Sequence, residues 1–429
     1  MTLKRIENWV FYIFLFAIPI SLRHIFGYQP FEYVEWTAIY VYATDLLLLV
    51  LFGFWIFRKG LPFTVSSLRK ADYFLLAFVV VACFSIFNAL NVQVAWFQWF
   101  KLIELVALYF YIKNYALKRF DMTAGFIAIV LCAAFQSVIA IAQFMMQSSV
   151  GLKYLGESTL NPAMSGIAAF YVHGIKVMRA YGTTPHSNVL AVYLFIALGA
   201  FYSLAIYHKR QWWWYALHAV TLWAFFLTFS RTIIALWVLN FIIRACIIRW
   251  YPRFRKEFWD NAQMRMRSLK IVWLTVAVAV AFLICYWPYI ISRSALSDTD
   301  QAVQMRVFYN HESLASGHNW FGLGIGNFVP WLMSQGLHIS SDLYQPVHNI
   351  YLLIYAEVGI IGLGLFLTFL ALLLYDFWRR LGFKKLYQCS FGLIIGSVLV
   401  MGLFDHYLWT IQSGRLLFFL VLGLLAGAE

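Results

Sequence analysis

The amino-acid sequence predicts an all-α, polytopic integral membrane protein, and its composition is the first reason. Of the 429 residues, 63% are hydrophobic and 12% are charged, whereas soluble proteins carry about 25% charged residues. The mean hydropathy is +0.75. Aromatic residues make up 20% of the chain, and the 18 Trp and 26 Tyr among them favour the two interfaces of a bilayer. Most of the protein surface must therefore face lipid.

The second reason is a series of long apolar segments. Roughly 17–25 apolar residues cross a bilayer as a helix, because a helix satisfies its own backbone hydrogen bonds. About twelve segments meet this criterion, and they predict one integral membrane domain over residues 1–429. They cover residues 7–22, 36–57, 72–90, 95–114, 122–146, 187–207, 211–229, 232–250, 270–291, 347–375, 385–404 and 411–428. The first segment ends without a small-residue cleavage site, which indicates a retained helix and not a signal peptide.

The third reason is the distribution of basic residues. If the N-terminus, with Lys4 and Arg5, lies in the cytoplasm, every alternate loop is rich in Lys or Arg, and these loops hold most of the 32 basic residues. The positive-inside rule then predicts that both termini are cytoplasmic. Anionic lipid headgroups explain the net charge of +14 better than nucleic acid does. The five cysteines show no zinc-ligand spacing and no disulfide framework.

Two long segments then lie on the outside, at residues 147–186 and 292–346. Loops of this length with little charge are seldom mere connectors. The first contains a moderately apolar stretch from Pro162 to Met178, which we expect to be a helix at the membrane interface.

Polar residues that could carry chemistry fall on this same outside face. The candidates are Arg179, Asn188, Arg231, Arg306, His348 and Asn349. Asn188 lies near the start of a predicted helix, where backbone N–H groups favour anions. The turn Phe229–Thr232 is so short that Arg231 must lie at the membrane surface.

Each of these residues also has a purely structural interpretation. Arg231 is suited to cap a helix C-terminus, and Asn349 is suited to cap a helix N-terminus. His348 could form an ordinary hydrogen bond at a helix start. The glycines at positions 322, 324 and 326 are more typical of turns or packing than of a phosphate-binding loop, because no predicted strand precedes them.

As a group, the outside residues suit a lipid diphosphate. Arg179, Arg231 and Arg306 offer forked, charge-assisted hydrogen bonds to phosphate oxygens. His348 can accept a proton from a hydroxyl near neutral pH. An apolar bundle beneath them would accept a lipid tail.

Several ionisable residues are predicted to lie within or beside apolar segments. Lys101 and Glu104 are three residues apart, so we expect a structural pair on one helix face. The others are Asp45, Asp405, His406 and Arg415. Such residues are costly in a membrane and are functional candidates by default.

Four motifs, in this order along the chain, resemble the O-antigen ligase and polymerase superfamily. They are RAYGTTPHSNVLA from Arg179, the turn Ser230-Arg231, Arg306 followed by GLGIGNF at 322–328, and HNIYL from His348. The resemblance covers about residues 170–375, and the first 150 residues match in hydropathy alone.

The resemblance implies a glycosyltransferase with a GT-C-like helical fold in the bacterial inner membrane, with no cofactor and no metal. The donor would be a glycan on undecaprenyl diphosphate, and the acceptor would be lipid A-core at the periplasmic face. His348 would deprotonate the acceptor hydroxyl, and displacement would invert the anomeric carbon. Arg231 and Arg306 would hold the diphosphate. The substrate-binding residues would be Arg179, Asn188 and Asn349.

Three alternatives remain. A polymerase would extend the glycan on its own lipid carrier; Arg306 and Gly317 fit the polymerase spacing R-x10-G, but Leu190 stands where Arg179 would require glycine. One long loop beside the HNIYL helix favours the ligase. A transporter would place its key residues near the midplane of the membrane. A non-catalytic envelope assembly protein would need no base at His348.

Overall fold

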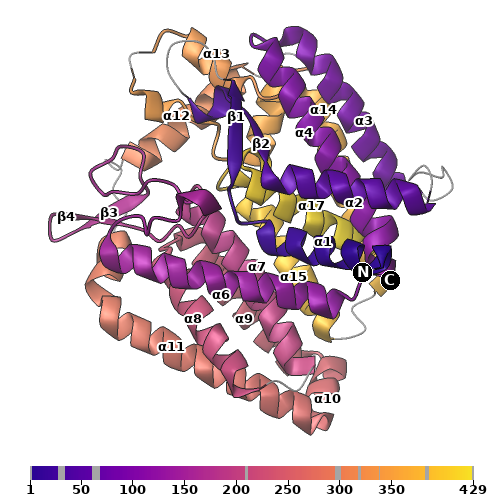
Figure 1. Ribbon diagram of the computed structural model, residues 1–429. Helices are drawn as coiled ribbons and strands as arrows, with labels where there is room; N and C mark the ends of the chain where they lie inside the picture. Colours follow the sequence, from indigo (N-terminus) through magenta and orange to yellow (C-terminus); the bar gives the residue numbers. More distant parts are fainter. Residues whose placement is uncertain are drawn as a thin grey trace. The chain divides into compact units, whose positions relative to one another are not determined.

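The computed structural model describes residues 2–27, 34–59, 68–207, 211–294, 301–316, 320–337, 339–381 and 386–427, and these residues are mostly helical (Figure 1). The chain divides into two compact units. Unit 1 consists of Met1–Leu22, Phe120–Leu296 and Phe383–Met401, and unit 2 consists of Arg23–Arg119, Ser297–Gly382 and Gly402–Glu429.

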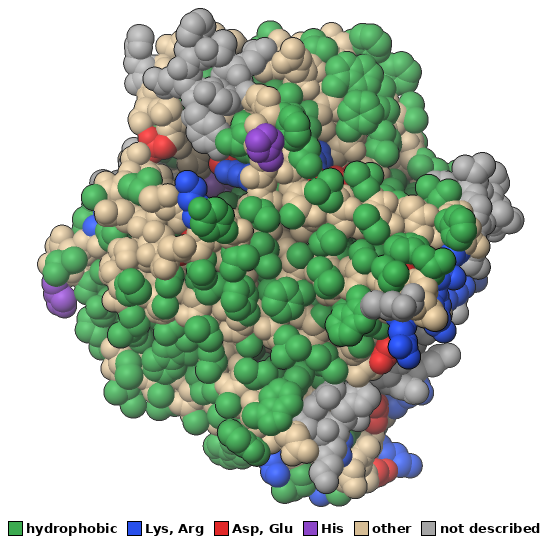
Figure 2. Space-filling view, viewed as in Figure 1, with side chains coloured by type: hydrophobic (Ala, Val, Ile, Leu, Met, Phe, Trp, Pro, Cys, Tyr) green, Lys and Arg blue, Asp and Glu red, His purple; other side chains and the backbone are tan. Residues whose placement is uncertain are grey.

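Unit 1 is a group of packed helices with one β-hairpin. Its α-helices are α1 (Leu3–Ala17), α6 (Met122–Met146), α7 (Ser187–Tyr207), α8 (Trp212–Leu227), α9 (Arg231–Trp250), α10 (Pro252–Asp260), α11 (Ala262–Ser294) and α15 (Leu386–Met401). α6 packs against α1, α7 and α8, and α15 packs against α7 and α9. Hydrophobic side chains cover the visible face of α6 and α11, whereas Lys and Arg gather around α10 (Figure 2). This surface suits contact with lipid.

The hairpin corrects one prediction, because the stretch from Pro162 to Met178 is not an interfacial helix. β3 (Ala169–Val172) pairs antiparallel with β4 (Ile175–Met178). His173 and Gly174 between them have φ values of 49° and 81°. Two successive positive φ angles make the tight turn that joins strands with a two-residue loop. The β-branched and aromatic residues on either side fit a strand better than a helix.

Unit 2 is built around α14 (Ile350–Leu381), which packs against α3 (Lys70–Ser85), α12 (Gln301–Ser316) and α17 (Gln412–Gly427). Its other helices are α2 (Ala43–Lys59), α4 (Val92–Tyr111), α5 (Leu117–Arg119), α13 (Phe328–Ser334) and α16 (Tyr407–Thr410). A short helix η1 (Glu35–Thr37) precedes the hairpin strand β2 (Ile39–Tyr42), which pairs antiparallel with β1 (Arg23–Gly27). The second predicted segment therefore becomes helical only from Ala43 onward.

Every apolar segment predicted from the sequence contains a helix of the structure. In the described part of the chain, 6 helices are long and apolar enough to cross a membrane: Lys70–Asn88, Met122–Met146, Ser187–Ile206, Arg231–Trp250, Ala262–Arg293 and Ile350–Arg380. The structure is mostly helical with several apolar helices, as predicted for an all-α membrane protein, apart from the two hairpins. The GT-C-like fold stays a prediction. The number of twelve spans and the single domain over 1–429 stay predictions.

α14 is broken at Gly359, where the backbone of residues 320–324 docks against it. Gly359 has a φ of 78°, in the left-handed region that favours glycine. The N–H of Leu323 donates to the carbonyl oxygen of Ala356 over 2.8 Å, and the N–H of Gly324 donates to that of Glu357 over 2.9 Å. The glycines at 322, 324 and 326 also have positive φ angles. They serve turns and close packing, as their structural interpretation predicts.

We expect Gly359→Ala to destabilise unit 2 strongly. A Cβ at this position would lie 2.1 Å from the carbonyl oxygen of Trp320, and a positive φ costs about 1–2 kcal/mol for a residue with a side chain. The Tm of the purified protein should fall by at least about 5 °C. Gly364→Ala is the matched control on the same helix, because a Cβ there has nothing within 4 Å. Equal Tm values for the two variants would contradict this account of the break.

Candidate functional site

The predicted site residues fall into two groups, one in each unit. Unit 1 contains Arg179, Asn188 and Arg231, and unit 2 contains Arg306, His348 and Asn349.

In unit 1, Arg179 holds the turn that carries Arg231. The Arg179 side chain is 4% exposed. Its Nε donates to the carbonyl oxygen of Thr228, and its Nη2 donates to Oδ1 of Asn188 over 2.6 Å. The hydroxyl of Ser230 donates to the same Asn188 oxygen over 3.1 Å. Arg179 and Asn188 are thus placed to position the turn between α8 and α9.

Phe229 at this turn has a φ of 45°, which is rare for a residue with a bulky side chain. Its ring centroid lies 4.8 Å from that of Phe170 on β3 and 5.9 Å from that of Phe282 on α11. Packing on several sides is what sustains such a conformation. The turn is therefore held in one geometry, and Arg231 begins α9 directly after it.

Arg231 lies beside the end of α11. Its Nη1 donates to the carbonyl oxygen of Arg293 over 3.2 Å, and Arg293 is in the last turn of that helix. This contact matches the helix-capping interpretation of Arg231. However, Arg231 is also the first residue of α9, and a positive charge at a helix N-terminus is unfavourable. The contact places the Arg231 side chain beside the backbone of a second arginine, Arg293. A guanidinium at this position is suited to bind an anion.

In unit 2, His348 lies just before α14 with an oxygen near each ring nitrogen, although Nδ1 makes no hydrogen bond within the described residues. Its Nδ1 is 3.4 Å from Oδ1 of Asp405, and its Nε2 is 3.2 Å from Oε1 of Gln345. The His348 side chain is 17% exposed and the Asp405 side chain 10%. A carboxylate beside an imidazole orients the ring and stabilises the imidazolium that forms when the ring takes a proton. The role of His348 as a general base stays a prediction.

His406 lies beside His348, and we call His348, Asp405 and His406 the histidine group. Its ring centroid lies 4.9 Å from that of His348, and its Nδ1 is 2.6 Å from the hydroxyl of Thr410. His348, Asp405 and His406 each offer one ligand atom, and these atoms lie within 4.8 Å of one another. Imidazole and carboxylate ligands suit Zn²⁺, so among the described residues these three could hold a metal. The expectation of a metal-independent reaction stays a prediction.

Arg306 lies on α12, one helical turn before Tyr309. The ring centroid of Tyr309 is 6.0 Å from that of His348, and its hydroxyl donates to the carbonyl oxygen of Leu343. Burial raises the pKa of Tyr309 above its ordinary value, so the phenol stays protonated. Within the described ranges, Arg306 makes no hydrogen bond or ion pair, which leaves its guanidinium available. Gly317, which completes the R-x10-G spacing, lies outside the described residues.

Asn349 acts as the N-terminal cap of α14. Its Oδ1 accepts hydrogen bonds from the N–H groups of Tyr351 over 2.9 Å and Leu352 over 3.2 Å. Its structural interpretation is confirmed by these contacts. A direct contact between Asn349 and substrate stays a prediction.

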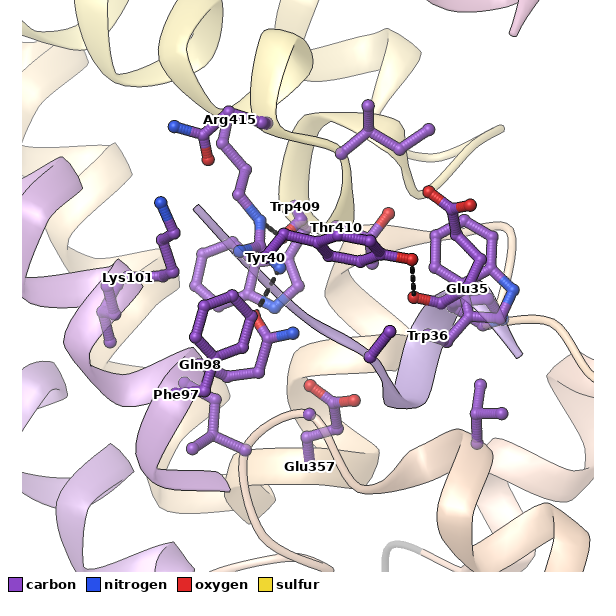
Figure 3. Close-up of a pocket in the computed structure, with 18 of the residues that line it drawn as sticks. Glu35, Trp36, Tyr40, Phe97, Gln98, Lys101, Glu357, Trp409, Thr410 and Arg415 are labelled. Carbon is purple, nitrogen blue, oxygen red and sulfur yellow. Dashed lines mark hydrogen bonds between the residues drawn. The ribbon is translucent and has the colours of Figure 1, made fainter. Parts of the chain in front are cut away.

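A polar cavity lies in unit 2 (Figure 3), and its lining residue Trp36 contacts the ring of His406. Gln98 and Lys101 of α4, Trp36 of η1, Glu357 of α14 and Arg415 of α17 face this cavity. Glu35, Trp36, Gln98 and Thr410 are half-buried, whereas Lys101, Glu357 and Arg415 are buried. Pro346 and Thr410 also line it. Pro346 lies two residues before His348, so the cavity is close to His348.

Lys101 and Glu104 form the predicted pair, with Nζ and Oε2 3.0 Å apart. Asp45 joins them through a second ion pair with Lys101. The sequence separates Asp45 from Lys101 by 56 positions, so only the packing of α2 against α4 reveals the three-membered cluster.

Residues 216–367 match the family model described as O-antigen ligase. This segment is similar to the O-antigen ligase family. The O-antigen ligase segment includes Arg231, Arg306, His348 and Asn349, whereas Arg179, Asn188, Asp405 and His406 lie outside it. The resemblance predicted from the motifs is confirmed for this segment, and it supports a broad O-antigen ligase-type or polymerase-type function. No curated protein matches the chain.

Three residues near the candidate sites were absent from the predicted site residues, namely Arg293, Asp405 and His406. Arg293 lies in the last turn of α11 and was not considered from the sequence. Asp405 and His406 were named only among the ionisable residues within or beside apolar segments. Their signal was a carboxylate and a histidine adjacent in an otherwise apolar segment, which is costly in a membrane without a role.

Proposed function

We propose that the protein is a glycosyltransferase of the O-antigen ligase type. It transfers a glycan from undecaprenyl diphosphate to lipid A-core at the periplasmic face of the bacterial inner membrane. The observation that carries this proposal is His348, which lies within the O-antigen ligase segment and is held beside Asp405 at 3.4 Å. The inside-positive distribution of Lys and Arg supports cytoplasmic termini and an outside position for His348.

The reaction assigns one step to each group of residues. An imidazole nitrogen of His348 takes the proton of an acceptor hydroxyl, and Asp405 stabilises the imidazolium. The hydroxyl oxygen forms a bond to the anomeric carbon. The bond from that carbon to the diphosphate oxygen breaks, and its electron pair leaves with the diphosphate. Attack from the opposite face inverts the anomeric carbon.

The arginines stabilise the leaving diphosphate. Arg231 and Arg306 keep their charge at any physiological pH and offer forked donors to phosphate oxygens. Their charge lowers the barrier because negative charge develops on the diphosphate as the bond breaks. Arg179 and Asn188 act by positioning Arg231, since both are engaged with the turn that carries it.

The test is transfer by the purified full chain in lipid nanodiscs, given undecaprenyl-diphosphate-linked glycan and lipid A-core, with EDTA and without nucleotide. We expect a glycan–lipid A-core conjugate. Lengthening of the lipid-linked glycan would instead identify a polymerase. Movement of the intact donor across the membrane without either product would identify a transporter. Loss of transfer in EDTA with recovery in Zn²⁺ would overturn the metal-independent mechanism and point to His348, Asp405 and His406 as ligands.

A further inference from the structure

The polar cavity of unit 2 has no part in the steps assigned above. It is bounded by aromatic side chains and by planar hydrogen-bonding groups (Figure 3). Trp36 and Phe97 line it with aromatic rings, and Gln98, Glu357 and Arg415 supply amide, carboxyl and guanidinium groups. An aromatic face with polar groups around it fits a molecule that has both C–H faces and many hydroxyls.

The charges of the polar cavity favour a neutral ligand. Two acidic and two basic side chains line it, namely Glu35, Glu357, Lys101 and Arg415, so their formal charges cancel. Lys101 is already paired with Asp45 and Glu104, and Glu35 is paired with Arg23. A phosphate would find no excess of positive charge here. A lipid tail would form no hydrogen bonds with the polar groups that line the cavity and would keep water from them, which is costly.

The lining side chains hold one another in place before any ligand binds. Nη2 of Arg415 donates to Oε1 of Gln98 over 2.7 Å, and its Nε donates to the carbonyl oxygen of Trp409. Nε2 of Gln412 donates to Oδ1 of Asp45 over 2.6 Å. A site that is ordered in advance loses less entropy on binding.

The polar cavity reaches the histidine group at its rim. Thr410 lines the cavity and its hydroxyl is 2.6 Å from Nδ1 of His406. The ring of Trp36 meets the ring of His406 edge to face, with centroids 5.0 Å apart. Pro346, two residues before His348, also lines the cavity. A ligand in the cavity would therefore lie beside the proposed base.

From this geometry we propose that the polar cavity is the subsite for a neutral sugar residue of the acceptor glycan, which presents one of its hydroxyls to His348. This proposal rests on the proposed function, because it is His348 as base that makes the ligand an acceptor. Trp36 stacks on the sugar, and Gln98 and Arg415 bind its hydroxyls. These are binding and specificity-determining residues.

The test measures binding and transfer separately. Core oligosaccharide, freed from lipid A and from any donor, is titrated into the full chain in nanodiscs by calorimetry. We expect Trp36→Ala and Gln98→Ala each to weaken Kd by roughly tenfold, equivalent to about 1.4 kcal/mol, and Trp36→Phe to fall between. In transfer assays, KM for the acceptor should rise more than kcat falls. Trp320→Ala is the matched control, because this side chain is 69% exposed in the same unit.

Each outcome decides one of the two proposals. Wild-type protein that transfers glycan, with KM and Kd unchanged in both variants, would overturn the sugar subsite and leave the proposed function standing. Oligosaccharide binding that both variants weaken, without transfer from any donor, would support the subsite and overturn the glycosyltransferase proposal. Competition by inorganic phosphate would contradict a neutral ligand. If Trp36→Ala lowers Tm strongly, the sugar subsite is judged from Gln98→Ala and Trp36→Phe alone.

Discussion

Replacing His348 by alanine is expected to abolish glycan transfer while the protein still folds and inserts into the membrane. A general base contributes about 10²–10⁴-fold to a rate, so kcat should fall by that factor. The loss should not come from unfolding, because the cap of α14 is the side chain of Asn349. The measurement is the initial rate of conjugate formation, with Tm as the check on folding.

The matched control is His311→Ala. This histidine lies on α12 in the same unit, with a side chain that is 78% exposed, and its loss should leave the rate unchanged. Asp405→Asn adds a test of positioning, since an amide cannot stabilise the imidazolium by charge. It should lower kcat more than it raises KM for either substrate. A normal rate for His348→Ala would refute the histidine as base.

Replacing Arg231 should have the second-largest effect. Removal of one preorganised donor from a developing negative charge costs about 10²–10³-fold in kcat, and Arg231→Ala should show a loss of this size. Arg231→Lys should recover little, because lysine lacks the forked geometry that matches two phosphate oxygens. The readout is kcat with lipid-linked donor at saturation.

Arg249→Lys provides the comparison for this substitution. Arg249 is exposed near the other end of α9. It lies on the same helix as Arg231, but we do not expect it to contact the diphosphate. A rate that falls equally in both variants would mean that Arg231 acts through general charge or stability. A full rate for Arg231→Lys would argue against diphosphate binding by a forked donor.

Much of the fold could be predicted because its causes are local along the chain. A segment such as 187–207 is apolar over a bilayer-spanning length, and α7 covers the same residues. The prediction of a helix from Pro162 to Met178 was wrong, because average hydropathy does not distinguish an interfacial helix from a short hairpin. The positive φ angles at His173 and Gly174 form the turn of a hairpin and are incompatible with a continuous helix.

The candidate site could be predicted only in part, for a related reason. Arg231 and His348 were recognisable for two reasons. Ionisable residues in apolar surroundings cost free energy, and both residues lie in the motifs SR and HNIYL. The partner of His348 was not recognisable, since Asp405 is 57 positions away along the chain and no spacing rule joins them.

By itself, the sequence determined that this is an all-α membrane protein, and it singled out Arg231, Arg306 and His348 as candidate residues. These conclusions depend on residue type and on sums over neighbouring positions. Only the tertiary structure decided that Asp405 accompanies His348, that Arg179 supports a turn, and that a polar cavity adjoins the histidine group. Such relations depend on which side chains packing brings within a few ångströms, and packing joins residues that are distant along the chain.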